Sequence, residues 1–343
     1  MRLGVVGVIL ATALVGAACS GDTPGRDDIA TREPAADETL ATEGSDVVIE
    51  TDLAYYEAPN GDVLRLDVYH PDGGQGLPLV VVFHSNPVFG RSKDSVASLA
   101  TIVAQRGAVV VAPAYGASLS MTDMGFLAAE VERWYREEGP CAVWAAVDLA
   151  ASFGADPSRL AVIGDVTGTL PANAVTFSPT TDTIAGCVAP PTQAPIATTI
   201  MFENDWFMVP SIWDSVLADD PDYINRIVPW DHLSEPTSTR IRILSGQNIA
   251  LDTVRPLQAA SYLESDWIRL RDPEGVWADA FAESGTLDDG EVSFAEVMQV
   301  VTALLIEARW DAEFAFVPGV GHSMSTDASK QLVADLVFQG LSS

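Results

Sequence analysis

The sequence predicts an α/β domain with a mostly parallel central sheet flanked by helices, and three observations support this prediction. Residues 77–84 and 108–112 are short, uninterrupted apolar runs of the kind that a parallel sheet buries on both faces. Such strands alternate with helical patterns along the chain, which implies right-handed crossovers. Apolar residues make up 48% of the 343 residues, which is enough for a large core.

The elements follow in order from residue 47. Two alternating runs flank the turn Pro59-Asn60-Gly61-Asp62, which predicts an N-terminal antiparallel hairpin. Apolar periodicity then predicts strands at 77–84, 108–112, 160–164, 240–244 and 313–317, and helices at 92–105, 122–138, 142–153 and 330–341. We expect an irregular lid at roughly 169–239, with one more strand at 196–202, and a helical insertion at roughly 257–309.

The N-terminus has the character of a secretory signal. Its apolar run, residues 3–18, is short for a transmembrane helix, and residues 1–18 read as a signal peptide. Gly16-Ala17-Ala18-Cys19 resembles the lipobox of bacterial lipoproteins, which implies lipidation of Cys19; simple cleavage is the alternative. Residues 19–46 are acidic and poor in large apolar side chains, so we expect a disordered tether before a domain at 47–343. The expected location is extracytoplasmic, either anchored to the membrane through Cys19 or secreted.

Charge and cysteine content restrict the partners and the compartment. The 48 acidic and 18 basic residues give a formal charge of −30, which repels nucleic acid and excludes it as a partner. With Cys19 lipidated, Cys141 and Cys187 remain in an oxidising compartment, where a disulfide between them is favoured. Two unpaired buried thiols are the alternative.

Three phrases together resemble one family. They are residues 64–71 (LRLDVYHP), 78–84 (PLVVVFH) and 156–164 (DPSRLAVIG). In this order they resemble the carboxylesterase and feruloyl-esterase-like branch of the α/β-hydrolases. The resemblance implies an α/β-hydrolase fold and a Ser-His-Asp arrangement for ester hydrolysis.

The family's nucleophile position is degenerate in this sequence. There, the strand after Asp-Pro-x-Arg ends in Gly-x-Ser-x-Gly, a sharp turn that exposes the serine. Only position 166 has glycine two residues before and two after it, Gly164 and Gly168, and it carries Val166. Valine has no oxygen to attack a carbonyl, and positive φ crowds its branched side chain. The resemblance therefore implies a non-functional nucleophile position.

The oxyanion loop also departs from the family pattern. Esterases of this type carry His-Gly-Gly-Gly after the strand, whereas this chain has His84-Ser85-Asn86-Pro87. Proline lacks an N–H and fixes φ, although the amide of Asn86 can donate. By resemblance, the oxyanion-loop residues are Ser85 and Asn86, together with Thr167 after the nucleophile position.

The remaining triad members have candidates. His322, in Gly319-Val320-Gly321-His322, matches the family's general base, and a purely structural histidine is the alternative. Asp252 matches the family's Asp-x-Val-x-Pro phrase if three residues are inserted, and a solvated loop aspartate is the alternative.

No cofactor or metal is expected. Residues 288–296 resemble the second half of a calcium-binding loop, but Gly285 and Leu287 stand at its first and third positions and offer no side-chain ligand. An acidic turn that caps the next helix is the better interpretation.

The sequence thus supports one main hypothesis: a catalytically inactive, lipid-anchored hydrolase fold that binds a small-molecule ligand or an envelope partner. An active esterase-type hydrolase with a non-standard nucleophile is the alternative. A purely structural envelope protein is a third.

Overall fold

The computed structural model describes residues 46–59, 61–85, 92–116, 124–180, 182–188, 195–203, 220, 223, 236–246, 257–258, 291–292, 294–321 and 323–342. Within these ranges, no helix is long and apolar enough to cross a membrane.

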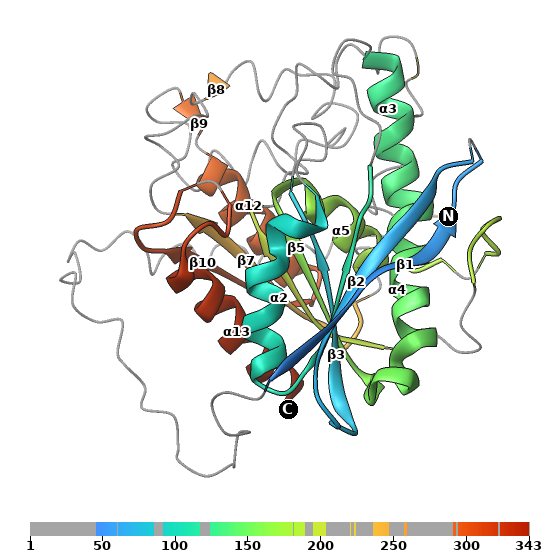
Figure 1. Ribbon diagram of the computed structural model, residues 1–343. Coiled ribbons are helices and arrows are strands. Elements are labelled where there is room, and N and C mark those ends of the chain that lie inside the picture. The colour runs from blue at the N-terminus through green and yellow to red at the C-terminus, as the bar shows by residue number, and fades with distance from the viewer. Residues whose placement is uncertain are drawn as a thin grey trace, which may run out of the picture.

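An eight-stranded sheet forms the centre of the molecule (Figure 1), in the order β1-β2-β4-β3-β5-β6-β7-β10. Its strands are β1 (Val47–Glu57), β2 (Val63–Pro71), β3 (Leu77–Phe83), β4 (Val109–Pro113), β5 (Ala155–Asp165), β6 (Ile196–Phe202), β7 (Arg240–Gly246) and β10 (Asp311–Val317). β1 and β2 form the predicted antiparallel hairpin, and β2 pairs antiparallel with β4. Every pair from β4 to β10 is parallel, so the carboxyl ends of these strands meet at one edge.

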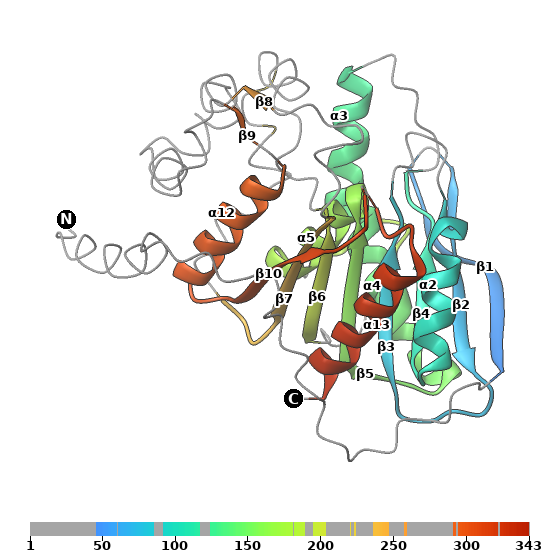
Figure 2. The same cartoon turned by 90° about the vertical axis from the view of Figure 1, so that its left-hand side faces the viewer.

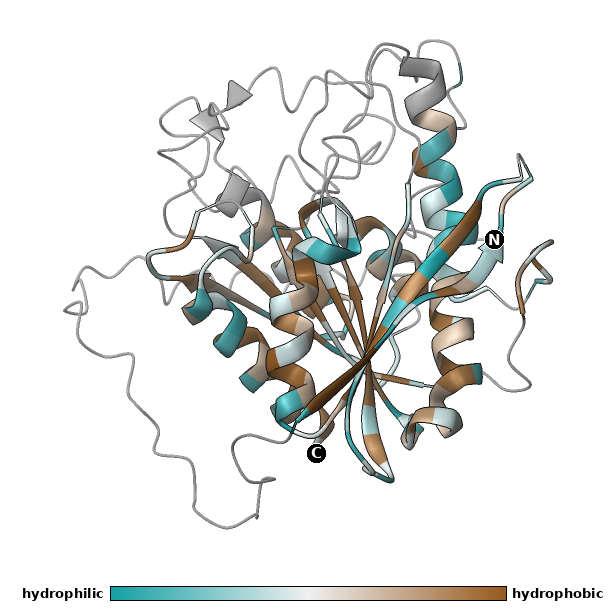
Figure 3. Cartoon of the chain, in the orientation of Figure 1, coloured by the Kyte–Doolittle hydropathy of each residue, from teal (hydrophilic) through white to brown (hydrophobic). Residues whose placement is uncertain are grey.

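Alternating side chains of the central strands enter two separate cores. Leu79, Val81 and Phe83 of β3 pack on one face of the sheet, and Val80 and Val82 pack on the other. All five are fully buried, as expected for a strand covered on both faces. The strands are accordingly hydrophobic along most of their length (Figure 3).

Helices cover both faces, which gives three layers (Figure 2). One face carries α2 (Ala97–Gln105), preceded by the 3₁₀ turn η2 (Lys93–Val96), and α13 (Asp327–Leu341). The other carries α3 (Met124–Arg133), α4 (Gly139–Leu149), the 3₁₀ turn η4 (Ala150–Phe153), α5 (Thr169–Phe177) and α12 (Phe294–Glu307). The range expected to form the lid therefore also contributes core, because every residue of α5 is buried.

The predicted break between two helices near residue 140 is wrong. A π-helical segment, η3 (Trp134–Glu138), joins α3 directly to α4. Pro140 stands directly after this junction, in the first turn of α4, where its missing N–H interrupts the ladder of backbone hydrogen bonds. The Gly139-Pro140 pair therefore marks a change of helical pitch and not an end.

A disulfide joins Cys141 of α4 to Cys187, as predicted, with the Cα atoms 5.5 Å apart. Cys187 also makes an isolated bridge with Tyr56 of β1, and Glu57 N–H donates to the carbonyl of Gly186 at 3.3 Å. The disulfide therefore attaches residues 182–188 to the helical layer, and the backbone contacts attach them to the hairpin.

The insertion expected at 257–309 contains a short strand pair as well as a helix. β8 (Leu257–Gln258) pairs antiparallel with β9 (Glu291–Val292), directly before α12. Residues 259–290, which include the first three residues of the calcium-loop-like phrase 288–296, lie outside the described residues. Of the rest of that phrase, residues 291–292 form β9 and residues 294–296 begin α12.

Candidate functional site

A sharp strand-to-helix turn stands at the carboxyl end of β5. The strand ends at Asp165, a single 3₁₀ turn (Val166–Gly168) follows, and α5 begins at Thr169. Val166 has φ of 52° and is only 1% exposed, so a buried, β-branched residue occupies the left-handed region that favours glycine.

The two glycines of this turn are fixed by close backbone contacts. A Cβ at Gly168 would lie 2.4 Å from the carbonyl oxygen of Phe83, and a Cβ at Gly164 would lie 2.7 Å from the carbonyl oxygen of Gly168. Both distances are shorter than real Cβ contacts allow, so only glycine lets β5, the turn and the end of β3 pack this closely. The glycine spacing in the sequence therefore has a steric cause.

Several residues with strained, positive-φ backbone lie at this same edge. Among the described residues, five non-glycine residues have positive φ, and three of them, Val166, Glu203 and Ser323, lie at or beyond the carboxyl ends of the parallel strands. Asp165 is the register partner of Phe202, so Val166 and Glu203 are the next residues of two adjacent strands. Strain of this kind costs on the order of 1–3 kcal/mol for each residue and is typical of functional sites.

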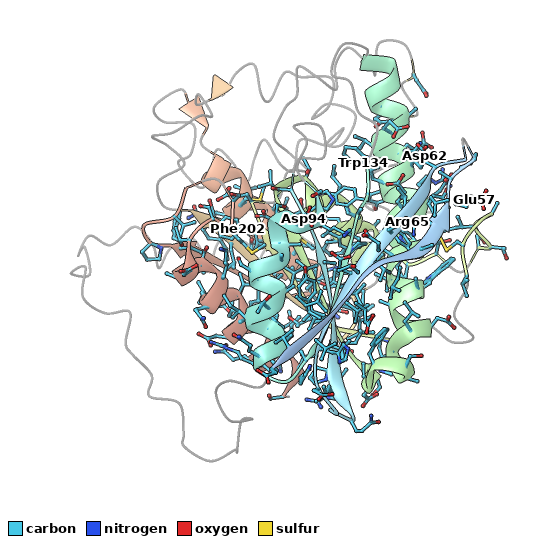
Figure 4. All side chains as sticks on the ribbon, in the orientation of Figure 1. Glu57, Asp62, Arg65, Asp94, Trp134 and Phe202 are labelled. Atoms are coloured by element: carbon cyan, nitrogen blue, oxygen red, sulfur yellow. A yellow bond between two sulfur atoms is a disulfide. The ribbon has the colours of Figure 1, made fainter. Side chains whose placement is uncertain are left out.

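Two buried carboxylates hold neighbouring loops onto the strand ends. Asp165 Oδ1 accepts the backbone N–H of Met324 at 3.0 Å, and Glu203 Oε1 accepts that of Gly246 at 2.5 Å. Glu203 is fully buried and directly follows Phe202, the last residue of β6. Phe202 is labelled in Figure 4. Burying a carboxylate costs free energy, and buried titratable groups of this kind cluster at functional sites. Glu203 is therefore a candidate functional residue.

A hydroxyl without a partner lies beside these carboxylates. Ser245, the penultimate residue of β7, is fully buried, and its Oγ has no hydrogen-bond partner among the described atoms. Buried polar groups are nearly always paired, with water or a ligand as the remaining choices. The edge formed by β5, β6 and β7 is therefore polar as well as strained.

The opposite flank of the turn is built by a histidine and a tyrosine. The hydroxyl of Tyr115 donates to the carbonyl of His84 at 2.5 Å and lies 3.5 Å from Thr167 Oγ1. His84 Nδ1 lies 3.1 Å from the carbonyl oxygen of Ser85, which can only accept, so Nδ1 donates and Nε2 is free to accept the N–H of Tyr115 at 3.5 Å. These contacts bring two predicted oxyanion-loop residues, Ser85 and Thr167, to one corner of the sheet.

His84 is held neutral. Burial lowers the pKa of its imidazole to about 4, more strongly than its hydrogen bond to Ser85 raises it. His84 is therefore a fixed hydrogen-bonding group of the corner and not a base at neutral pH.

A buried ion pair supports this corner from the helical layer. Arg133 pairs with Glu138 at 2.6 Å and also with Glu130, and Glu138 accepts the N–H of Gly116 at 2.9 Å. Trp134 packs its ring edge-on against Tyr115, with the centroids 5.5 Å apart. Burial raises the pKa of Glu138, an effect that Arg133 opposes. The π-helical segment thus fixes the chain that leaves β4.

A cavity is present at the opposite edge of the sheet. Its volume is about 250 Å³, and it lies at the amino ends of β6 and β7, whereas Val166 lies at the carboxyl end of β5. Its lining includes Trp144, Val175, Ile196 and Thr239. No group of three or more potential metal ligands occurs among the residues that the structure describes.

The comparisons with known proteins add one finding. No protein-family model matches the sequence, and no curated protein matches it. Solved structures do match. Esterase 2 of the Planctomycetes species Thermogutta terrifontis with propionate bound has a TM-score of 0.55 at 15% identity, over 84% of this chain and 93% of that chain. Its butyrate-bound form has a TM-score of 0.56, again at 15% identity over 84% and 93%. The same esterase phosphorylated by paraoxon has a TM-score of 0.54 at 16% identity, over 85% and 93%.

This protein has an α/β-hydrolase fold. At this level of identity the likeness concerns the fold, and the chemistry depends on the residues themselves. In an α/β-hydrolase the turn after β5 is where the nucleophile stands, and here the residue in the strained conformation is Val166.

Several predicted residues lie outside the described part of the chain, namely Cys19, Asn86, Asp252 and His322. Sequence reasoning missed Glu203 and Tyr115. A signal for Glu203 was present, because an acidic residue directly follows the apolar run 196–202. Tyr115 carried no such signal, since nothing local places it beside Thr167.

Proposed function

We propose that the protein is a non-hydrolysing member of the esterase-type α/β-hydrolases, in which Val166 occupies the nucleophile position and the former active site binds a small-molecule ligand or an envelope partner. The left-handed conformation of Val166 in the turn between β5 and α5 carries this proposal. A side chain in that conformation points where an attacking oxygen is needed, and valine supplies only methyl groups.

The loss of the nucleophile is large in free-energy terms. In a serine hydrolase, removing the serine of a triad lowers turnover by about 10⁶-fold, or roughly 8 kcal/mol in the barrier. The remaining oxyanion hole and binding contacts give only weak catalysis. Pro87, which follows Asn86 in the sequence, removes a further N–H from the oxyanion loop.

We also propose that the protein is extracytoplasmic and anchored to a membrane through lipidated Cys19. The Cys141–Cys187 disulfide supports an oxidising compartment, because disulfides rarely persist in a reducing one. Detergent phase partitioning of the protein from its native host tests the anchor: the parent should enter the detergent phase and Cys19→Ala the aqueous phase. Equal partitioning of both would contradict it.

Covalent labelling by paraoxon tests the nucleophile directly, since Thermogutta terrifontis esterase 2 is recorded as phosphorylated by paraoxon. The parent and Val166→Ala should show no diethylphosphoryl adduct by intact mass, because neither side chain has an oxygen to attack phosphorus. Val166→Ser should gain one adduct, and Val166→Ser with His322→Ala should lose it. An adduct on the parent, or turnover of short p-nitrophenyl esters that His322→Ala removes, would favour the alternative of an active hydrolase.

A further inference from the structure

The cavity at the amino ends of β6 and β7 is walled by two helices and the starts of two strands. Four residues of α4, at the spacing that places them on one face of the helix, line one wall: Pro140, Val143, Trp144 and Val147. Val175 of α5, Ile196 of β6 and Thr239, directly before β7, line the opposite wall. Trp144 and Val175 are buried, so they form the inner surface.

The size of the cavity exceeds that of a packing defect. Protein interiors are close-packed, and voids larger than a water molecule are few. This cavity measures about 250 Å³, whereas an apolar cavity of about 150 Å³ is enough to bind benzene. Four lining residues are exposed and form a mouth toward solvent: Pro179, Pro195, Thr237 and Ser238. A molecule of one or two rings can therefore enter and fit.

The lining carries no charge. All of its described residues are apolar, proline, threonine or serine, although the chain has 48 acidic and 18 basic residues. A charged ligand would lose its hydration here without gaining a counterion, which is costly. The formal charge of −30 repels anions in addition. The cavity is therefore suited to a neutral molecule.

The hydroxyl groups of the lining are largely used within the protein. Thr176 Oγ1 and Thr239 Oγ1 each donate to a backbone carbonyl at 2.7 Å, and Thr237 Oγ1 donates to Thr239 Oγ1 at 2.8 Å. A hydroxyl has one hydrogen to donate, so these three offer none to a ligand. Ser238, at the mouth, has no hydrogen-bond partner within the described part of the chain. A ligand thus needs at most one polar group, placed at the mouth.

Trp144 and the prolines favour a flat, rigid ligand. Aromatic pairs gain more than their buried area alone provides, and Trp144 offers the largest aromatic surface of the lining. Pro140, Pro179 and Pro195 have fixed φ, and the disulfide of Cys141 holds the α4 wall beside Pro140. A wall that is already ordered lowers the entropy cost of binding.

We propose that this cavity binds a small, neutral aromatic molecule that makes a single hydrogen bond with Ser238. The inference goes beyond the proposed function, because the cavity lies at the amino ends of β6 and β7 and the former active site lies at the carboxyl end of β5. The two sites share no residue, so either proposal can fail without the other.

Calorimetric titration of the full-length parent protein with 2-naphthol is the direct test. This probe is neutral, aromatic and carries one hydroxyl group. Naphthalene-2-sulfonate has the same rings and a fixed negative charge, and it is the matched probe. We expect 2-naphthol to bind at one site and the sulfonate to bind at least about tenfold more weakly. Absence of 2-naphthol binding, or equally tight binding of the sulfonate, would overturn the proposal.

A pair of variants on α4 locates the probe. Val147→Trp adds bulk to the cavity wall and should weaken 2-naphthol binding at least about tenfold. Asp148→Trp introduces the same side chain at the next position, which is exposed and outside the lining, and should leave the affinity within about twofold. An unchanged affinity in Val147→Trp would place the probe elsewhere, the former active site included, and would overturn the assignment to this cavity.

Ser238 provides two further variants at an exposed position. Ser238→Ala should weaken binding by about two- to tenfold, the value of one neutral hydrogen bond, and an affinity equal to that of the parent would overturn its role. Thermal melts show whether each variant folds. If Val147→Trp does not fold, Ser238→Trp obstructs the mouth instead and should cause the same loss of at least about tenfold. Parent-like binding by Ser238→Trp would then overturn the proposal.

Discussion

Breaking the Cys141–Cys187 disulfide should destabilise the domain by about 4 kcal/mol. The bond closes a loop with a sequence separation of 46 residues, and the chain-entropy relation for a loop of this length gives that value near 25 °C. Burial of Cys141 and the contacts of residues 186 and 187 with β1 keep the joined segments in place in the folded state, so the effect falls mainly on the unfolded chain.

The corresponding shift in melting temperature follows from the size of the domain. A domain of about 300 residues unfolds with an entropy of roughly 0.6 kcal/mol/K, so a loss of 4 kcal/mol lowers the Tm by about 6 °C. Scanning calorimetry of the oxidised protein and of the protein reduced with a non-thiol reductant measures this shift. Thiol titration should show two additional thiols after reduction.

Cysteine variants provide the control for the reduced protein. Cys141→Ala, Cys187→Ala and the double variant should lose nearly the same disulfide contribution, because one substitution already removes the bond. Any excess in variants that include Cys141→Ala reports the cavity at that buried site. Reduced and oxidised proteins that melt within about 1 °C of each other would refute the entropic account.

Two further predictions concern the buried polar groups around the turn. The unfolded chain protonates His84 below about pH 6.5 and the folded protein only below about pH 4, so the free energy of unfolding should fall by roughly 3 kcal/mol as the pH drops through that window. Urea titrations should show that His84→Gln removes this loss and that His70→Gln does not; an unchanged pH dependence in His84→Gln would contradict it. Arg133→Leu should cost about 3–5 kcal/mol, because it leaves the fully buried Glu138 without its cation. The double variant Arg133→Leu/Glu138→Gln should be clearly milder in the same assay, and a double variant as unstable as the single one would show that the cost comes from packing.

The fold was predictable where apolar runs are uninterrupted. The strand expected at 196–202 coincides with β6, although its surroundings are poorly periodic, because a strand buried on both faces needs no alternation. The helix at Thr169–Phe177 was missed for a related reason: it is buried on every side, so it has no polar stripe to reveal its period. Local pattern therefore identifies a fully buried strand, which is a short apolar run, better than a fully buried helix, whose period is hidden.

The candidate site was predictable only in part. The glycine spacing located the turn around Val166, because steric contact across a few residues leaves a local mark in the sequence. The arrangement of Tyr115, His84 and Thr167 depends on three separate strand ends meeting, and such contacts leave no local pattern. Glu203 is of the same kind, since its contacts with β7 follow from the order of strands in the sheet.

The backbone of the turn is set by its surroundings and not by the residue at position 166. Valine is among the residues least suited to positive φ, yet Val166 adopts it, which means that packing of the turn outweighs a strain on the order of 1–3 kcal/mol. Gly164 and Gly168 provide that packing by letting β5 and α5 close onto β3 at distances that exclude a Cβ. A serine at position 166 would therefore inherit the same backbone with less crowding at its β-carbon. For this reason a single substitution is a fair test of whether the rest of the site can still use a nucleophile.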